Sequence, residues 1–209
     1  MSYAELTAKS CFSFLEGASF PGDLVEQAQT LGLAAIGICD NNGVYGIPRA
    51  YQKWKILGAA AGSAAAPNPV PVPKLITGAC LSLRTADGSP LPSLYLLATD
   101  RAAYGNLCRL LTAAHAGKEK GEAHLTLEAF CCDRDMPSLS GLIALAQAPG
   151  TQGLYPNVIA AGAGAAPAGG NPLSDYYLRL AQMPFKEFYL CLGRFVDGLD
   201  QQRTERALA

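Results

Sequence analysis

The stretch that most constrains the fold is residues 3–51, which has the pattern of a strand, a helix and a second strand. Apolar residues recur at helical spacing between 21 and 31, so an amphipathic helix is predicted there. The segments 3–6 and 34–39 have the length and apolar character of strands on either side of it. Such a strand–helix–strand unit predicts parallel pairing with a right-handed crossover.

Local signals mark the ends of these elements. Ser19 is the candidate N-cap of the helix, and Gly32 supplies its stop. The second strand is closed by residues 40–43, Asp-Asn-Asn-Gly, which end in a strong turn signal. Because chemistry in parallel α/β folds lies at the C-terminal ends of strands, the polar segments 7–10 and 40–42 are the candidate site.

Composition bounds the class of protein. At 209 residues, with 50% hydrophobic and 16% charged residues, the chain suits one domain with a buried sheet. A net charge of −1 without a basic cluster predicts poor DNA binding by this chain alone. The 7 cysteines form no CxxC, which favours reduced, buried thiols over disulfides or a zinc site. No apolar run reaches the about 18 residues of a membrane span, so we expect a cytoplasmic protein without membrane contacts.

The rest of the chain continues the alternation of strands and helices. Further strands are predicted at 74–83, 93–98, 141–146 and 187–192. Helices are predicted at 48–57, 101–115 (capped by Asp100), 173–183 and from Asp200 onward, with a short helical or extended piece at 125–130. The Ala-, Gly- and Pro-rich segments at about 58–73 and 160–172 are predicted to be flexible insertions. The whole of 1–209 is therefore expected to be one domain with about six strands.

Several motifs occur together and in a fixed order. The chain opens with YAEL-x-x-x-S-x-FSFL-x-GAS at residues 3–19, and D-x-x-G-x-YG-x-x-R follows at 40–49. Further matching segments are 75–79, 95–98, 104–111, 125–128 and 141–145. This series resembles the N-terminal PHP domain (polymerase and histidinol phosphatase) of bacterial C-family DNA polymerases. The likeness is strongest to the error-prone and DNA polymerase III alpha-subunit-like members.

The resemblance implies a distorted, seven-stranded β/α barrel. We expect an α/β fold of that type in incomplete form, because the family's last strand and its terminal Asp-x-His motif would lie beyond Ala209. The family's palm, fingers and thumb domains would lie there too. One hypothesis is therefore a domain of a longer polymerase, and another is the inactive product of a truncated or split polymerase gene.

The resemblance also implies a metal site at the barrel mouth. Active members hold two or three divalent ions, Zn²⁺ or Mn²⁺, through His, Asp and Glu side chains, and the ions activate water and brace a phosphate. The positions of this chain that align with those ligands are Thr7, Lys9, Glu16, Asp40, Asn41 and Cys80. Two of the six keep a carboxylate, none is histidine, and the ammonium of Lys9 repels cations. We therefore expect a degenerate site with no metal cofactor and no catalytic residue.

Lys9 is predicted to replace the lost metals. Glu16 and Asp40 would converge on the barrel mouth, where two uncompensated carboxylates destabilise each other. An ammonium between them would restore the balance of charge. The alternative is that the long Lys9 stem carries its charge out into solvent.

Two classes of function are compatible with the resemblance. The first is a non-catalytic structural module of an error-prone DNA polymerase, a nucleotidyltransferase of DNA replication and translesion repair. Such a module would contact the polymerase core domains and would meet DNA only through them. The second is a metal-dependent phosphoesterase or 3′–5′ proofreading exonuclease. The missing ligands argue against the second class, because His115 and His124 align with no metal ligand.

Overall fold

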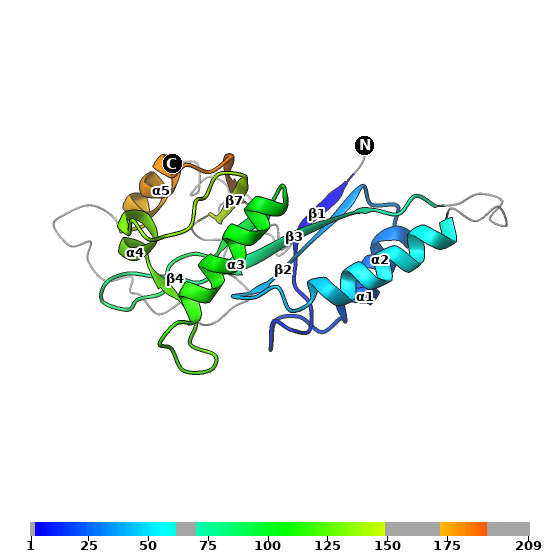
Figure 1. The fold of residues 1–209 in the computed structure, drawn as a ribbon, viewed down its shortest axis with the longest axis horizontal. Coiled ribbons are helices and arrows are strands. Elements are labelled where there is room, and N and C mark those ends of the chain that lie inside the picture. The colour runs from blue at the N-terminus through cyan, green and yellow to red at the C-terminus, as the bar shows by residue number, and fades with distance from the viewer. Residues whose placement is uncertain (1–2, 62–69, 149–171, 192–209) are drawn as a thin grey trace, which may run out of the picture.

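A six-stranded sheet organises the computed structural model, which describes residues 3–61, 70–148 and 172–191 (Figure 1). Its strands, in their order across the sheet, are β1 (Ala4–Ala8), β2 (Ala35–Asn41), β3 (Lys74–Leu81), β5 (Leu94–Ala98), β7 (Leu142–Gln147) and β8 (Glu187–Cys191). The helices are α1 (Pro21–Thr30), α2 (Ile47–Ala61), α3 (Arg101–His115), α4 (Leu127–Cys132) and α5 (Pro172–Gln182). The predicted number of main strands is confirmed.

The directions of the strands differ in one place from the prediction. β1, β2 and β3 are mutually parallel, and β7 is parallel to β8, as the strand–helix alternation predicts. β5 is antiparallel to both of its neighbours, β3 and β7. For the pair of β3 and β5 the reason is the connection, since residues 82–93 contain no helix and a parallel crossover needs one.

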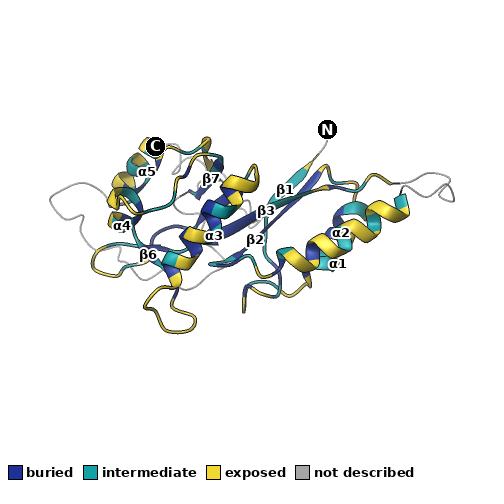
Figure 2. Ribbon diagram, viewed as in Figure 1, coloured by how far each residue is buried: buried dark blue, intermediate teal, exposed yellow. Residues whose placement is uncertain are grey.

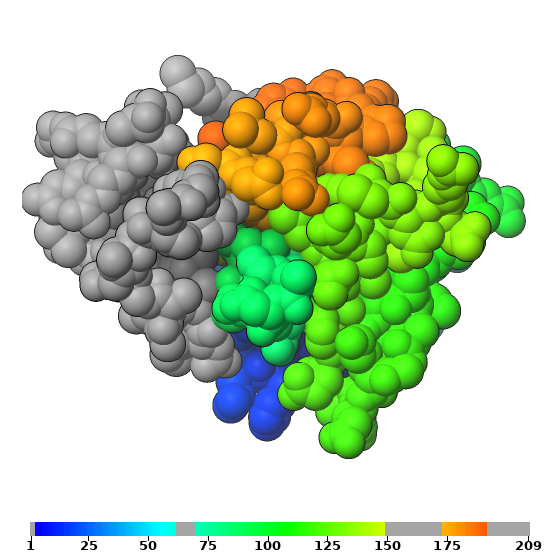
Figure 3. All heavy atoms as spheres, turned by 90° about the vertical axis from the view of Figure 1, so that its left-hand side faces the viewer, coloured from blue at the N-terminus to red at the C-terminus, as the bar shows by residue number. Residues whose placement is uncertain are grey.

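Two groups of helices cover the outer face of the sheet. α1 and α2 pack on β2 through a cluster built on Val25, Ile36 and Ile38. α3, α4 and α5 cover the other half through a larger cluster, in which Tyr176 and Leu180 of α5 are fully buried. Figure 2 shows the buried residues along the sheet and the exposed faces of the helices turned outward. Figure 3 shows the orange surface of α5 directly beside the yellow-green surface of α4, with which it is in contact.

The inner face of the sheet has a core of its own, built on Cys39, Cys80, Tyr95, Leu97 and Leu145. Leu6 of β1 and Cys191 of β8 both pack against this cluster, although their strands lie at opposite edges of the sheet. The sheet of the described residues is therefore curled into a half-barrel, and the expected α/β barrel in incomplete form is confirmed.

Several element boundaries differ from the prediction. The N-cap of α1 is Phe20, which makes no capping hydrogen bond through its side chain, so the choice of Ser19 is wrong. α2 continues past Gly58 to Ala61, because three alanines with high helix propensity follow the glycine. Residues 58–61 of the first predicted insertion are therefore helical. Residues 62–69, most of the second insertion (160–171) and the predicted last helix lie outside the described residues.

A second, smaller sheet was not predicted. It pairs β4 (Leu83–Arg84) in parallel with β6 (Leu125–Thr126). Two residues are too few to show a strand periodicity in the sequence.

Among the described residues, no helix combines the length and the apolar character that crossing a membrane requires.

Candidate functional site

Lys9 lies directly after β1, at the C-terminal end of the parallel strands. Its ammonium forms an ion pair with the carboxylate of Glu16. The Lys9 side chain is 8% exposed and that of Glu16 is 24% exposed. The Lys9 Nζ also lies 5.8 Å from the ring centroid of Tyr95 on β5. Lys9 therefore points into the mouth of the half-barrel and not into solvent.

The loop after β1 folds back on itself and so brings Glu16 to Lys9. The amides of Glu16 and Gly17 both donate to the carbonyl of Ser13, at 2.9 Å each. Gly17 is required by a close approach, because a Cβ at this position would lie 2.1 Å from the Ser10 carbonyl oxygen. This tight turn places a side chain seven residues away from Lys9 beside its ammonium.

Asp40, at the end of β2, is only 1% exposed and is held by two serines. Its Oδ1 accepts from the Ser10 amide at 2.8 Å and from the Ser13 hydroxyl at 2.8 Å. The Ser10 hydroxyl lies 2.9 Å from Oδ1 and 2.8 Å from Oδ2. Among the described residues the ion pair of Lys9 is with Glu16 and not with Asp40. Of the two carboxylates that the ammonium was predicted to lie between, it therefore pairs with Glu16.

Gly46 keeps the surroundings of Asp40 tight. A Cβ at Gly46 would lie 2.7 Å from Asp40 Oδ2 and 3.0 Å from the Ser10 hydroxyl oxygen. The carboxylate thus faces backbone and hydroxyl donors on one side and close-packed chain on another. We infer that Asp40 fixes the loop after β1 to the end of β2.

Cys80, on β3, is buried beside Lys9 and Glu16. Burial raises the pKa of the Cys80 thiol, and the nearby Lys9 ammonium and a hydrogen bond with Ser93 oppose this rise. Burial also raises the pKa of the neighbouring Cys39 thiol well above its ordinary value. Both thiols are therefore neutral near pH 7 in the chain without a metal ion.

Thr7 and Asn41 occupy the remaining predicted positions. The Thr7 amide and hydroxyl both donate to Glu5 Oε1, at 2.8 Å and 3.2 Å. The Asn41 amide donates to the Ser13 hydroxyl at 3.1 Å, so the backbone of this residue also supports the loop. The structure thus groups Lys9, Glu16 and Cys80, while Thr7 is engaged along β1.

Sequence reasoning missed the residues that hold the mouth in place. Ser10 and Ser13 belong to the opening motif, but nothing marks them as partners of a residue 27 or 30 positions away. Asn42 has a φ of 46°, and its amide nitrogen donates to the Ser82 hydroxyl at 2.9 Å. The ring of His115 contacts the Asn42 carbonyl at 2.8 Å, which places this histidine in a structural contact. The Asn-Gly turn was the available signal for Asn42.

The side chains at the mouth do not fit a metal cluster. Within the described residues, no group of three or more His, Cys, Asp and Glu side chains is placed to hold a metal ion. Glu16 already has a cation partner, and the Asp40 oxygens already accept from protein donors. The arrangement can hold two charges and a loop in place, and it offers no imidazole to a dication.

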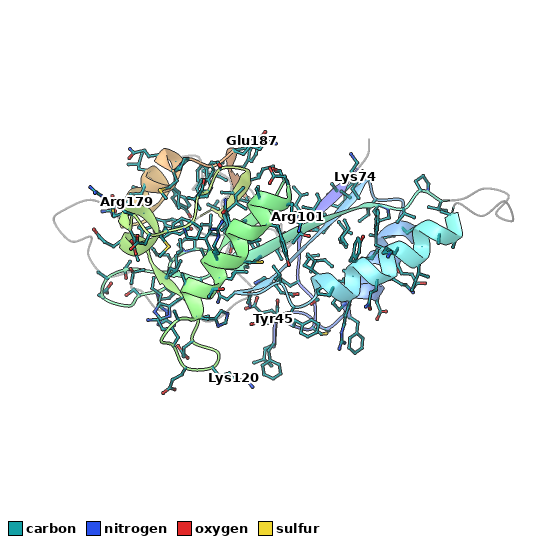
Figure 4. All side chains as sticks on the ribbon, in the orientation of Figure 1. Tyr45, Lys74, Arg101, Lys120, Arg179 and Glu187 are labelled. Carbon is teal, nitrogen blue, oxygen red and sulfur yellow. The ribbon has the colours of Figure 1, made fainter. Side chains whose placement is uncertain are left out.

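A cavity of about 760 Å³ lies at the other end of the half-barrel. Charged Lys74, Asp100 and Glu187 and apolar Leu97 and Ile143 are among its lining residues. Lys74 and Glu187 begin their strands, whereas Lys9 follows the end of β1. Figure 4 shows Lys74 and Glu187 at the upper edge of the view, away from Tyr45 at the lower edge. The cavity is therefore separate from the predicted site.

Comparison with known proteins identifies the family of the matching region. A family model described as "PHP domain" matches residues 5–190. An error-prone DNA polymerase of Rhodopseudomonas palustris (strain BisA53) is 46% identical over 150 residues, which are 67% of this chain and 11% of that polymerase. An error-prone DNA polymerase of Anaeromyxobacter sp. (strain K) is 45% identical over 116 residues, or 56% of this chain and 9% of that protein. The chain thus spans about a tenth of the length of these curated relatives.

A solved structure shares the fold. It is described as a metal-dependent phosphoesterase from Bifidobacterium adolescentis ATCC 15703. The TM-score is 0.56, and the match covers 99% of this chain and 82% of that chain. At 14% sequence identity the likeness concerns the fold alone.

Proposed function

Because the chain belongs to the PHP domain family, we propose that it is a non-catalytic member that serves as a structural module of an error-prone type of DNA polymerase. The relatives at about 45% identity are error-prone DNA polymerases, and they support this parentage. The proposed role is to pack against the polymerase core, with DNA bound by that core and not by this domain.

The observation that carries the proposal is the ion pair of Lys9 and Glu16 at the barrel mouth. A lysine in this place supplies the positive charge that a carboxylate-lined mouth needs, and it repels a dication at short range. The hydrogen bonds of Asp40 support the same conclusion, because this carboxylate already accepts from Ser10 and Ser13 and so holds the loop in place. The role of the mouth is then to stabilise the fold, without activating water.

A nuclease and phosphatase assay tests the proposal. The purified chain is incubated with Zn²⁺ or Mn²⁺ and a 3′-recessed primer–template or p-nitrophenyl phosphate. We expect no release of nucleotide or p-nitrophenol above a Lys9→Met, Glu16→Gln control. Hydrolysis that chelation abolishes, and that this double variant lacks, would assign the chain to the phosphoesterase or exonuclease class.

A further inference from the structure

The loop between β1 and α1 presents apolar side chains to solvent. Phe14 is 83% exposed and Leu15 is 90% exposed. Phe20, at the start of α1, and Tyr45, after β2, are each 58% exposed. Exposed apolar side chains that gather on one surface, rather than standing singly, are typical of interaction sites.

This loop is fixed and not loosely extended. The Cys11 amide donates to the Ser19 carbonyl at 2.9 Å and so closes the base of the loop. The Asp40 carboxylate accepts hydrogen bonds from Ser10 and Ser13 and so anchors the first part of the loop. Leu15 has a φ of 65°, a left-handed conformation that is unfavourable for leucine. The fold thus holds a strained leucine almost fully in solvent, which is a pattern found where strain serves a function.

The exposed loop is continuous with the start of α2. The rings of Phe12 and Tyr45 lie 6.4 Å apart between centroids. The Arg49 guanidinium lies 5.4 Å from the centroid of the Phe12 ring. Arg49 lies in the first turn of α2, which has no acidic residue, so it gives the border of this surface a positive charge. Figure 4 shows Tyr45 at the lower edge of the molecule.

We propose that this loop surface, formed by Phe12, Phe14, Leu15, Phe20, Tyr45 and Arg49, docks on the polymerase core. The proposal rests on the proposed function, because it names the surface by which the structural module meets its partner. The matching surface on the core is an apolar pocket for Phe14 and Leu15, bordered by a carboxylate that pairs with Arg49. Aromatic residues and arginine dominate the binding energy of protein interfaces, which this composition matches.

The chemistry of the loop surface favours a protein over a single-stranded nucleic acid. Base stacking requires aromatic faces along a basic groove, whereas Leu15 has no ring and is the most exposed large side chain of the surface. Arg49 is the cation that lies against the Phe12 ring, and Glu26 neutralises Lys53 in an ion pair. An apolar pocket on a protein would bury Phe14 and Leu15 together, whereas stacked bases would leave Leu15 without a partner.

The test compares the free 209-residue chain with a chimera in which this chain replaces the matching N-terminal segment of the Rhodopseudomonas polymerase. The variant is Phe14→Ser with Leu15→Asn, because asparagine tolerates the left-handed conformation. The control is Leu178→Ser on α5, where the leucine is 63% exposed. Thermal unfolding and hydroxyl-radical labelling of Phe14 are measured in both proteins.

We expect the variant to leave the unfolding temperature of the free chain unchanged or slightly raised, because asparagine relieves the strain at position 15, and to lower that of the chimera. The control should change neither, and Phe14 should label several-fold more slowly in the chimera. Equal labelling of Phe14 in both proteins, or a wild-type chimera less stable than the parent polymerase, would overturn the proposal. The proposal would also be overturned if the free chain formed a dimer, or bound oligo(dT), and the variant lost that property. The surface would then belong to a contact with a second copy or with nucleic acid. A metal-dependent hydrolase whose Phe14 is protected would keep this proposal and remove only the non-catalytic function.

Discussion

The Lys9 ammonium and the Glu16 carboxylate form an ion pair across the turn that follows β1. Both side chains are largely withdrawn from solvent, and the pair lies beside the ring of Tyr95 and the thiol of Cys80. In such surroundings a charge without its partner is unfavourable, so each group depends on the other. We therefore expect the mouth of the half-barrel to lose stability when either partner of the pair is removed.

Lys9→Met should destabilise the chain at neutral pH. Methionine keeps the apolar stem but leaves the Glu16 carboxylate without its cation. We expect the free energy of unfolding to fall by about 1–3 kcal/mol, between the values for exposed and fully buried pairs. Urea denaturation measures this change. Lys53→Met is the matched control, because its partner Glu26 is 53% exposed, and we expect about 0.5 kcal/mol or less there. Equal effects of the two substitutions would contradict the role given to Lys9.

Asp40→Ala should be more destabilising, because it removes the acceptor of several buried hydrogen bonds. The Ser10 amide and the Ser10 and Ser13 hydroxyls would lose their partner, at about 1–3 kcal/mol for each buried group left unsatisfied. Ser13→Ala removes one of these donors and should have a smaller effect. In denaturant unfolding, the double variant should lose less stability than the sum of the single variants. Strict additivity would show that the serine and the aspartate act independently.

Gly58→Ala should stabilise the protein. A Cβ at this position meets no atom within 4 Å, and Gly58 lies inside α2. Replacing a helix-interior glycine by alanine is worth about 0.5–1 kcal/mol. Gly37→Ala is the opposite control, since its Cβ would lie 2.5 Å from the Leu6 carbonyl oxygen. Thermal unfolding with no gain for Gly58→Ala would indicate that α2 ends at Gly58, as the sequence alone predicts.

The buried thiols should resist modification in the native protein. Burial raises the pKa of Cys39 and Cys80, whereas Cys132 is exposed. Alkylation by iodoacetamide at pH 8, followed by peptide mass spectrometry, should label Cys132 first and Cys39 only after unfolding. Rapid labelling of Cys39 under native conditions would contradict the buried inner face.

These thiols also predict an alkaline loss of stability. The folded-state pKa of Cys39 lies above the ordinary value of 9.0, so its contribution is complete below about pH 9. The contribution is lost as the pH rises from there through the folded-state value. Denaturation between pH 8 and 10.5 should show a declining free energy of unfolding, with a shallower decline in Cys39→Ala. An unchanged slope in this variant would exclude Cys39 as a source of the decline.

Much of the fold could be predicted because local signals agree with each other. α3 runs from Arg101 to His115 as predicted, since Asp100 caps it and its apolar residues lie on one face of the helix. The order of the six main strands along the chain follows from their apolar runs. The direction of β5 could not be read in this way, because it depends on the absence of a crossover helix after β3.

The site was predictable only in part. The resemblance placed Lys9 and Glu16 at one mouth, and the structure brings them together. Asp40 takes its donors from Ser10 and Ser13 instead of from Lys9. Such contacts are set by the packing of the loop after β1 on the end of β2, and no periodicity in the sequence encodes them.

Metal content tests the central claim most directly. The purified chain is loaded with Zn²⁺ or Mn²⁺, dialysed and measured by inductively coupled plasma mass spectrometry, with Lys9→Met beside it. We predict far less than one metal ion per chain, because Lys9 occupies the mouth and the Asp40 carboxylate already accepts from Ser10 and Ser13. A stoichiometric metal ion that remains after dialysis, and is lost in Glu16→Gln, would contradict it.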